Sequence, residues 1–327
     1  MIVVERDTLI DDWVCNFGDV VQPGSLVVLN DTRVRHARVL GKRRGSGGKV
    51  ELLLLGRVKA CSQHNAVERW QALGKPSRGL RAGTWVDAEG FSIQVIECRG
   101  GGHFTIDVQS TDGSQVECAL ERWGHVPIPP YLGRPDEPGD KTRYQTIYAK
   151  RHGSVAAPTA GLHLTERTLE VLRERQVEIG HVTLHVGIGT FRPVAVADLD
   201  DHPMHSEWFE VSAGLAERVA TARRRGKPVV AVGTTAVRAL ESAADAANHG
   251  CVKPTSGLTC LLIQPGYRFG VVDGFLTNFH QPKSTLLALV SAAIGVERTH
   301  EAYRVAIERG YRFLSYGDAM WIPQRLL

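Results

Sequence analysis

Apolar and polar positions in the second half of the chain follow two alternating periods. Short apolar runs indicate buried strands, and segments with apolar residues three or four positions apart indicate amphipathic helices. Strand followed by helix, repeated along a chain, is typical of a parallel or mixed sheet with helices outside it. The pattern predicts strands at 181–186, 228–233, 258–263, 271–279 and 311–315, and helices at 166–176, 215–226, 236–248, 285–294 and 298–309.

The first residues add two short strands. Residues 1–4 are apolar, and the apolar run 25–29 ends in the polar residues 30–33. We interpret 25–29 as a buried strand with a polar tip. Further along, Thr165 precedes the first predicted helix and is its expected N-cap, because a threonine hydroxyl can accept from a free N–H of the first turn.

Residues 35–124 have a different texture. Short apolar alternations such as 49–55, 69–73 and 91–96 are separated by many glycines. Short strands at close spacing with glycine turns are typical of a small all-β barrel or sandwich. The predicted fold class is therefore α/β: a main domain of 1–34 and 125–327, with a barrel-like mixed sheet and outer helices, and an inserted β-barrel domain at 35–124.

Composition narrows the class of protein only slightly. The chain has 327 residues, 43% of them hydrophobic, and a net charge of +4, which permits a polyanionic partner without requiring one. Its six cysteines never fall into CxxC spacing, and no apolar run approaches 18 residues. We expect reduced, buried thiols, a cytoplasmic location and no membrane segment.

Two glycine-bearing loops, 158–163 and 187–193, flank the helix and strand at 166–186. They would place backbone donors, hydroxyls, a histidine and an arginine near one another. His163 is the best single candidate for proton transfer, because imidazole titrates near neutrality; a structural histidine bonded to a loop carbonyl is the alternative. The other candidates in these loops are Thr159, Gly161, Thr190 and Arg192.

Two further turns lead from a strand into a helix. At 229–235 the helix start carries Thr234 and Thr235, which can hold an anion or simply cap the helix. Arg238 and Glu241 lie three residues apart on that helix and can pair on its surface. The turn at 278–285 carries more polar and ionisable side chains than the turn at 229–235. Loops at strand ends often carry functional side chains, so these residues are candidates. They are Asn278, His280, Lys283 and Ser284.

Metal and nucleic-acid sites have weaker signals. His181 and His185 are four residues apart, but the valine-rich segment indicates a strand, where this spacing disfavours a zinc site. Two basic runs, 42–44 and 223–227, can be solvated surface or can contact phosphates. Arg33, Arg143 and Asp318 lie at element ends and can be structural or functional.

Longer sequence segments give a more specific signal than single motifs do. PTAGLHLTE, TLHVGIGTFRPV, MHSEWFEV, VVAVGTTAVRALES, VVDGFLTNFHQPKSTLLALVSA and YRFLSYGDAM occur in this order. With them the chain resembles the bacterial S-adenosylmethionine:tRNA ribosyltransferase-isomerases of the queuosine pathway. The resemblance extends from 26 to 322.

The resemblance implies an enzyme that transfers and isomerises the ribosyl group of S-adenosylmethionine onto 7-aminomethyl-7-deazaguanine (preQ1) in tRNA, giving epoxyqueuosine and releasing adenine and methionine. S-adenosylmethionine is then a consumed substrate, with no cofactor and no metal, and the partner is the anticodon loop of preQ1-containing tRNA. We expect a monomer. We assign the base to His163, with Asp318 or Glu166 as alternates. Thr234, Thr235 and Lys283 are assigned to the methionine carboxylate or a phosphate, and Arg143 and Tyr144 to the nucleic acid.

Two alternatives stay open. Family members carry a further segment before the position of Met1, so we expect the chain to begin inside or after it, and it can be a silent tRNA-binding paralogue. The less favoured alternative is a metal-dependent hydrolase that uses His181, His185 and either His202 or His205.

Overall fold

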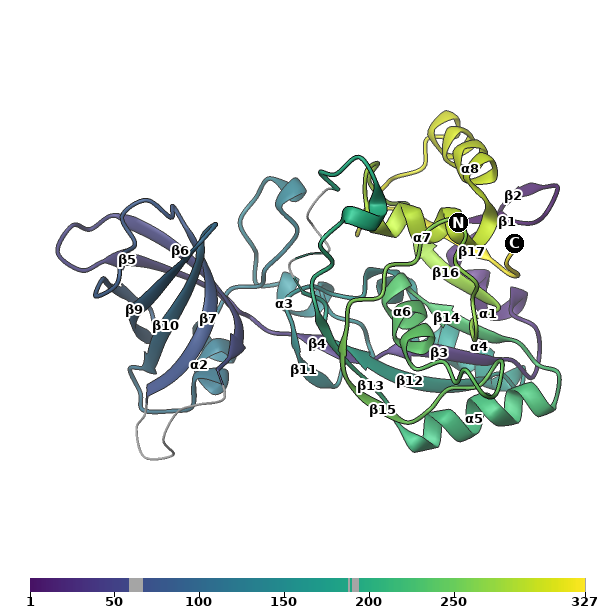
Figure 1. Ribbon diagram of the computed structural model, residues 1–327, viewed down its shortest axis with the longest axis horizontal. Helices are drawn as coiled ribbons and strands as arrows, with labels where there is room; N and C mark the ends of the chain where they lie inside the picture. The colour runs from purple at the N-terminus through teal and green to yellow at the C-terminus, as the bar shows by residue number, and fades with distance from the viewer. Residues whose placement is uncertain (59–66, 188, 190–193, 327) are drawn as a thin grey trace. The chain divides into compact units, whose positions relative to one another are not determined.

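The computed structural model describes residues 1–58, 67–187, 189 and 194–326 (Figure 1). The described chain divides into two compact units. The first comprises Met1–Arg33 and Gln145–Leu327, and the second comprises Val34–Tyr144. The second unit therefore extends 20 residues beyond the predicted boundary at 124, since it also includes the proline-rich segment and the short helix before Tyr144.

A nine-stranded mixed sheet forms the centre of the first unit, in the order β15-β13-β12-β3-β14-β16-β17-β1-β2. Strands β12, β3, β14 and β16 are neighbours and parallel, so their carboxyl ends meet at one edge. The strands are β1 (Ile2–Val4), β2 (Leu9–Asp11), β3 (Leu26–Asn30), β12 (Glu178–Leu184), β13 (Glu207–Val211), β14 (Val229–Val232), β15 (Thr255–Thr259), β16 (Gly274–Asn278) and β17 (Ala319–Ile322). A separate two-stranded sheet pairs β4 (Thr32–Val34) with β11 (Arg151–Ser154).

Both faces of this sheet are buried at its central strands β3, β14 and β16, which explains their continuous apolar runs. In β3, Leu26 and Val28 belong to one core cluster, and Val27 and Leu29 belong to another. This two-residue alternation is the strand period. The helices and 3₁₀ turns of the unit are η1 (Val14–Asn16), α1 (Phe17–Val20), η3 (Thr159–His163), α4 (Glu166–Glu174), η5 (Leu199–Asp201), α5 (Ala213–Arg224), α6 (Thr234–Ser242), α7 (Thr285–Ile294) and α8 (Val296–Glu308).

The second unit contains a closed six-stranded antiparallel barrel in the order β10-β7-β6-β5-β8-β9 (Figure 1). The barrel core includes Leu52, Trp70 and Ile106, and α2 adds Ala119 and Leu120 to it. Its elements are β5 (Arg38–Arg43), β6 (Lys49–Arg57), β7 (Val67–Lys75), β8 (Trp85–Ala88), β9 (Phe91–Gly100), β10 (His103–Ser110), α2 (Val116–Trp123), η2 (Pro130–Leu132) and α3 (Asp140–Arg143). The predicted α/β class with a β-barrel is confirmed; the division into folding domains stays a prediction.

Some predicted elements are wrong in extent or kind. The strand predicted at 258–263 is β15 (Thr255–Thr259), which ends four residues earlier. Helix α6 begins at Thr234 and ends at Ser242, after Gly233 turns the chain with φ 89° and ψ 148°, a conformation that only glycine adopts readily. Residues 311–315 form no strand. Leu314 has a positive φ of 74°, and the rings of Tyr311 and Phe313 pack against Phe279 instead.

The expectation of buried thiols is also wrong for the described cysteines. Cys15, Cys98, Cys118 and Cys260 are exposed, and Cys251 is half-buried. In the described part of the chain, every helix is too short or too polar to cross a lipid bilayer.

The predicted cap of α4 is present as a reciprocal pair. The Thr165 hydroxyl accepts from the Thr168 backbone N–H at 3.2 Å, and the Thr168 hydroxyl accepts from the Thr165 N–H at 3.4 Å. We expect Thr165→Ala to lower the free energy of unfolding by about 1 kcal/mol, because one first-turn N–H loses its acceptor. Urea denaturation measures the change. Thr165→Ser keeps the acceptor and serves as control; equal losses in both variants would contradict the capping role.

Candidate functional site

Polar side chains gather where the four parallel strands end. Asn30 ends β3, His185 follows β12, Gly233 and Thr234 follow β14, and Asn278 ends β16. The carboxyl edge of a parallel sheet is where α/β proteins usually bind ligands. We therefore take this edge as the candidate site.

Asn30 links three elements at this edge. Its amide nitrogen donates to the Leu184 carbonyl and to the Thr235 hydroxyl, each at 3.0 Å. Its amide oxygen accepts from the Leu184 N–H at 3.0 Å and from the Thr32 N–H at 3.2 Å. The side chain is fully buried, so these contacts fix β3, β12 and the start of α6 together.

A second group connects the tips of β3 and β12. The Thr183 hydroxyl donates to the Asp31 carboxylate at 2.6 Å. The Thr32 hydroxyl lies 2.8 Å from Nδ1 of His185, whose ring stacks on Trp208 with centroids 4.9 Å apart. His185 is thus oriented on both its edge and its face.

His163 is held at the end of β16 by Asn278. The Thr159 hydroxyl donates to the Asn278 amide oxygen at 3.0 Å, which turns the amide nitrogen toward Nε2 of His163, also at 3.0 Å. An amide nitrogen only donates, so Nε2 accepts and the neutral imidazole carries its proton on Nδ1. His163, Asn278 and Thr159, predicted separately, therefore form one hydrogen-bonded chain.

Burial lowers the pKa of His163, and the negative charge of Asp318 opposes that shift. The ring is therefore neutral at pH 7 and has a carboxylate near enough to favour its protonated form. Asp318 is held by the Arg312 backbone N–H at 2.7 Å. Glu166, the other alternate, lies exposed in the first turn of α4, where no described contact connects it to this group.

Close backbone packing holds the His163 turn against the sheet. A Cβ at Gly161 would overlap the Tyr148 hydroxyl, so only glycine fits there. A Cβ at Gly233 would lie 3.6 Å from Cβ of Ala160. The turn that carries His163 and the turn that begins α6 are therefore direct neighbours.

The remaining predicted residues near the strand ends differ in exposure and in their hydrogen-bond partners. Thr234 and Thr235 are 6% and 8% exposed at the start of α6. Ser284 caps α7 by accepting from the Leu287 N–H at 3.2 Å, and Lys283 is exposed with a φ of 53°. The Thr277 hydroxyl lies 2.8 Å from Nε2 of His280, and burial lowers the pKa of His280 to about 4.

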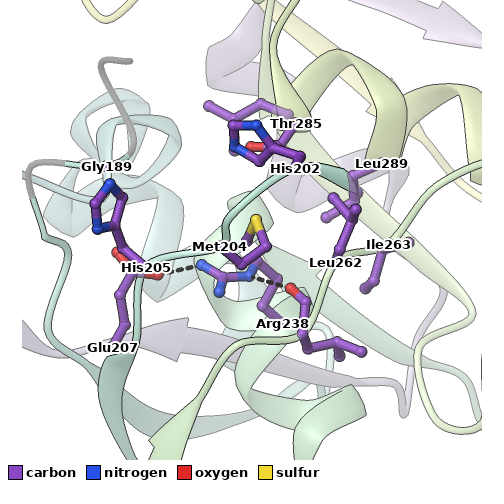
Figure 2. Close-up of a pocket in the computed structure, with 12 residues that line it drawn as sticks. Gly189, His202, Met204, His205, Glu207, Arg238, Leu262, Ile263, Thr285 and Leu289 are labelled. Carbon is purple, nitrogen blue, oxygen red and sulfur yellow. Dashed lines mark hydrogen bonds and ion pairs between the residues drawn. The ribbon is translucent and has the colours of Figure 1, made fainter. Parts of the chain in front are cut away.

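A pocket lies beside α6 (Figure 2). Arg238 points into it and pairs with Glu207 of β13, while its Nε donates to the Leu261 carbonyl at 3.1 Å. The predicted surface pair of Arg238 with Glu241 is wrong. Glu241 is buried on another side of the helix, where it accepts from the N–H groups of residues 270, 271 and 272.

Several predicted residues are not brought to this edge by any described contact. Arg33 is half-buried in β4. Arg143 is exposed in α3 of the second unit, and Tyr144 is fully buried, which disfavours stacking of a base on its ring. Thr190 and Arg192 lie outside the described residues.

Sequence reasoning missed Asn30, Thr32 and Glu207. Asn30 could have been found as the first polar residue after a buried apolar run. Glu207 shares the inward face of β13 with Phe209 and Val211, so its position in the alternation was the signal.

The basic runs are largely engaged on their own units. In the first unit, Arg223 pairs with Asp273, Arg224 with Glu217 and Arg225 with Glu178. In the second unit, Arg44 pairs with Asp87. Among the described residues, no three His, Cys, Asp or Glu side chains group as metal ligands.

Comparison with known proteins gives consistent matches along the chain. A family model described as queuosine biosynthesis protein matches residues 1–322. The S-adenosylmethionine:tRNA ribosyltransferase-isomerase of Sorangium cellulosum is 53% identical over 317 residues, which cover 92% of this chain and 85% of that protein. The protein of the same name from Synechococcus sp. (strain CC9311) is 50% identical over 316 residues, covering 94% and 83%.

A solved structure is also similar. The crystal structure of S-adenosylmethionine tRNA ribosyltransferase from Thermotoga maritima is 28% identical, with a TM-score of 0.52. The match covers 98% of this chain and 91% of the other.

The pKa of His280 predicts a pH-dependent stability. Between about pH 6.5 and pH 4 an unfolded His280 takes up a proton that the native state refuses, so acidification favours unfolding by up to about 3 kcal/mol. Urea denaturation at pH 7, 6 and 5 should show a steeper loss in the parent than in His280→Gln, which has no titrating group. Parallel losses in the two proteins would contradict the buried neutral histidine.

Proposed function

This chain belongs to the family of queuosine biosynthesis proteins, and from that membership we infer its reaction and propose how its residues perform it. It transfers and isomerises the ribosyl moiety of S-adenosylmethionine to preQ1 at the tRNA wobble position. The products are epoxyqueuosine-tRNA, adenine and methionine. The agreement of 53% over 92% of the chain with a relative named for this reaction carries the conclusion.

The reaction makes three physical demands. The positive sulfonium makes the neighbouring 5′ carbon acidic, so a general base must reach its proton. The departing adenine needs a hydrogen-bond donor or a proton. The modified base must leave the anticodon stack to enter the site.

We assign the base to His163. Its ring is neutral at pH 7. The lone pair of Nε2 accepts a hydrogen bond from the neutral Asn278 amide, which a substrate can displace more easily than a charged partner. Substrate must displace the Asn278 amide to reach that lone pair. Asp318 then stabilises the imidazolium that forms, because its charge favours the protonated ring.

An anion, either the methionine carboxylate or a tRNA phosphate, fits the start of α6. The first-turn N–H groups of a helix have no intrahelical acceptors and favour negative charge. The Thr235 hydroxyl accepts from Asn30 and so keeps its own proton to donate. Thr234 and the exposed Lys283 complete the proposed set.

For the tRNA we propose phosphate contacts by Arg33 and Arg143, since phosphate contacts position a nucleic acid without reading its sequence. The enzyme acts on the anticodon loop of preQ1-containing tRNA and consumes S-adenosylmethionine without a further cofactor. We propose that it does so in the cytoplasm and as a monomer. Adenine formed from S-adenosylmethionine in the presence of preQ1-tRNA, measured by chromatography, tests the activity against a silent tRNA-binding protein.

The base assignment predicts a large loss in one variant. His163→Ala should lower kcat by about 10²- to 10⁴-fold, the usual contribution of a general base. Exchange of deuterium from the 5′ carbon of S-adenosylmethionine should slow in parallel. His300→Ala changes an exposed histidine of α8 and is the control. Parental turnover by His163→Ala would exclude His163 as the base.

The anion proposal predicts a binding defect. Replacing Thr234 and Thr235 together with alanine should weaken binding of S-adenosylmethionine or tRNA at least about tenfold, because a single hydrogen bond to a charged group contributes about 1.5–3 kcal/mol. Equilibrium binding of each substrate measures the change, and circular dichroism checks that the fold persists. Unchanged affinity for both substrates would reject the proposal.

A further inference from the structure

The pocket beside α6 contains a buried donor that has no acceptor in the described part of the chain. Arg238 is 8% exposed, and its guanidinium uses Nη1 on Glu207 and Nε on the Leu261 carbonyl. Its Nη2 is buried and has no partner among the described residues. A buried unpaired donor is unfavourable, so an acceptor supplied by a ligand would be favoured here.

The charge of the pocket restricts what that ligand is. Arg238 is already neutralised by Glu207, which is itself 5% exposed. A carboxylate or phosphate placed at Nη2 would lie close to the Glu207 carboxylate and would be repelled by it. The pocket therefore suits a neutral acceptor.

The walls of the pocket are largely apolar. Met204, Leu262, Ile263, Leu286 and Leu289 line it together with the polar groups; its enclosed part is only about 30 Å³ and opens to solvent, so a ring would enter it by one edge. Figure 2 shows Met204 beside the guanidinium of Arg238, with Leu262 and Leu289 on the neighbouring segments. Aliphatic and thioether side chains around a few fixed polar groups are typical of a pocket for a flat, neutral ring.

We propose that this pocket binds the adenine ring of S-adenosylmethionine and, after reaction, free adenine. The inference rests on the proposed function, which supplies adenine as a leaving group. Adenine has apolar faces and ring nitrogens that accept hydrogen bonds, so Nη2 of Arg238 has an acceptor. His202 also lines the pocket, and its buried Nδ1 has no partner in the described part of the chain, so it can bond the exocyclic amino group or a ring nitrogen according to its tautomer.

The acceptor substrate fits the pocket less well. A deazaguanine keeps the O6 acceptor on the edge where it pairs, but it also presents two N–H groups there and carries an aminomethyl cation, and these donors require acceptors of their own. The unused group of Arg238 is a donor, and both oxygens of Glu207 are already engaged, one by Arg238 and the other by the Gly187 N–H at 2.8 Å. The pocket therefore favours adenine over preQ1.

Filling the pocket tests the inference without removing the buried ion pair. Leu262→Trp puts a large ring among the apolar walls, and Leu258→Trp places the same ring on β15 at a position that is 69% exposed and outside the pocket. We expect Leu262→Trp to raise both the KM for S-adenosylmethionine and the inhibition constant of free adenine at least tenfold. Leu258→Trp should leave both constants at parental values. Circular dichroism verifies that each variant folds.

A second variant keeps the pocket open. Arg238→Lys retains a positive charge beside Glu207 but loses the planar fork that presents Nη2. We expect it to raise the inhibition constants of adenine and of purine alike, because both rings present the nitrogen acceptors that Nη2 would bond. Parental inhibition constants for both rings would overturn the role of Arg238.

The possible outcomes distinguish failure of the adenine pocket from failure of the proposed reaction. If the parent chain releases adenine on preQ1-tRNA but Leu262→Trp keeps the parental KM and adenine inhibition, the adenine pocket is overturned and the reaction stands. If Leu262→Trp weakens only preQ1-tRNA, the pocket holds the acceptor base and the inference is likewise overturned. If the parent releases no adenine at all, the proposed function itself fails.

Discussion

The side-chain amide of Asn30 fixes the place where the candidate site is built. It is fully buried, and its two polar atoms bond β12 through Leu184, the start of α6 through Thr235 and its own strand tip through Thr32. A buried amide is stable only when its donors and acceptors are paired. Moving any of these elements would leave an unpaired buried group. The strand and helix ends that carry the loops around the site are therefore fixed in position.

Helix α6 is held in the same manner along its length. Arg238 faces β13 and pairs with Glu207, and Glu241 faces the segment 270–272 and accepts its N–H groups. Removing one partner of such a contact leaves an uncompensated buried charge, which is far less favourable than the pair. The helix therefore has one rotation about its axis that satisfies both residues, and that rotation points Nη2 of Arg238 into the pocket.

The two histidines near β16 differ in their electrostatic surroundings. Burial lowers the pKa of both, but only His163 has the charge of Asp318 acting against that shift. His280 is bonded to Thr277 within its own turn and stays neutral, as a structural residue does. His163 is neutral at rest and has a carboxylate to compensate a gained proton, which is the setting that a general base requires.

Local signals in the sequence determined the fold class, the cap at Thr165 and the helix 285–294, and they placed His163 and Asn278 among the candidates, because period, capping and turn chemistry depend on near neighbours. Only the tertiary structure decided which residues meet. Arg238 pairs with Glu207, 31 positions away, because the face of α6 that carries it is turned toward β13. Likewise the aromatic residues at 311–315, apt for a strand, pack on Phe279. Such choices depend on the relative placement of elements distant in sequence, and no local pattern encodes that placement.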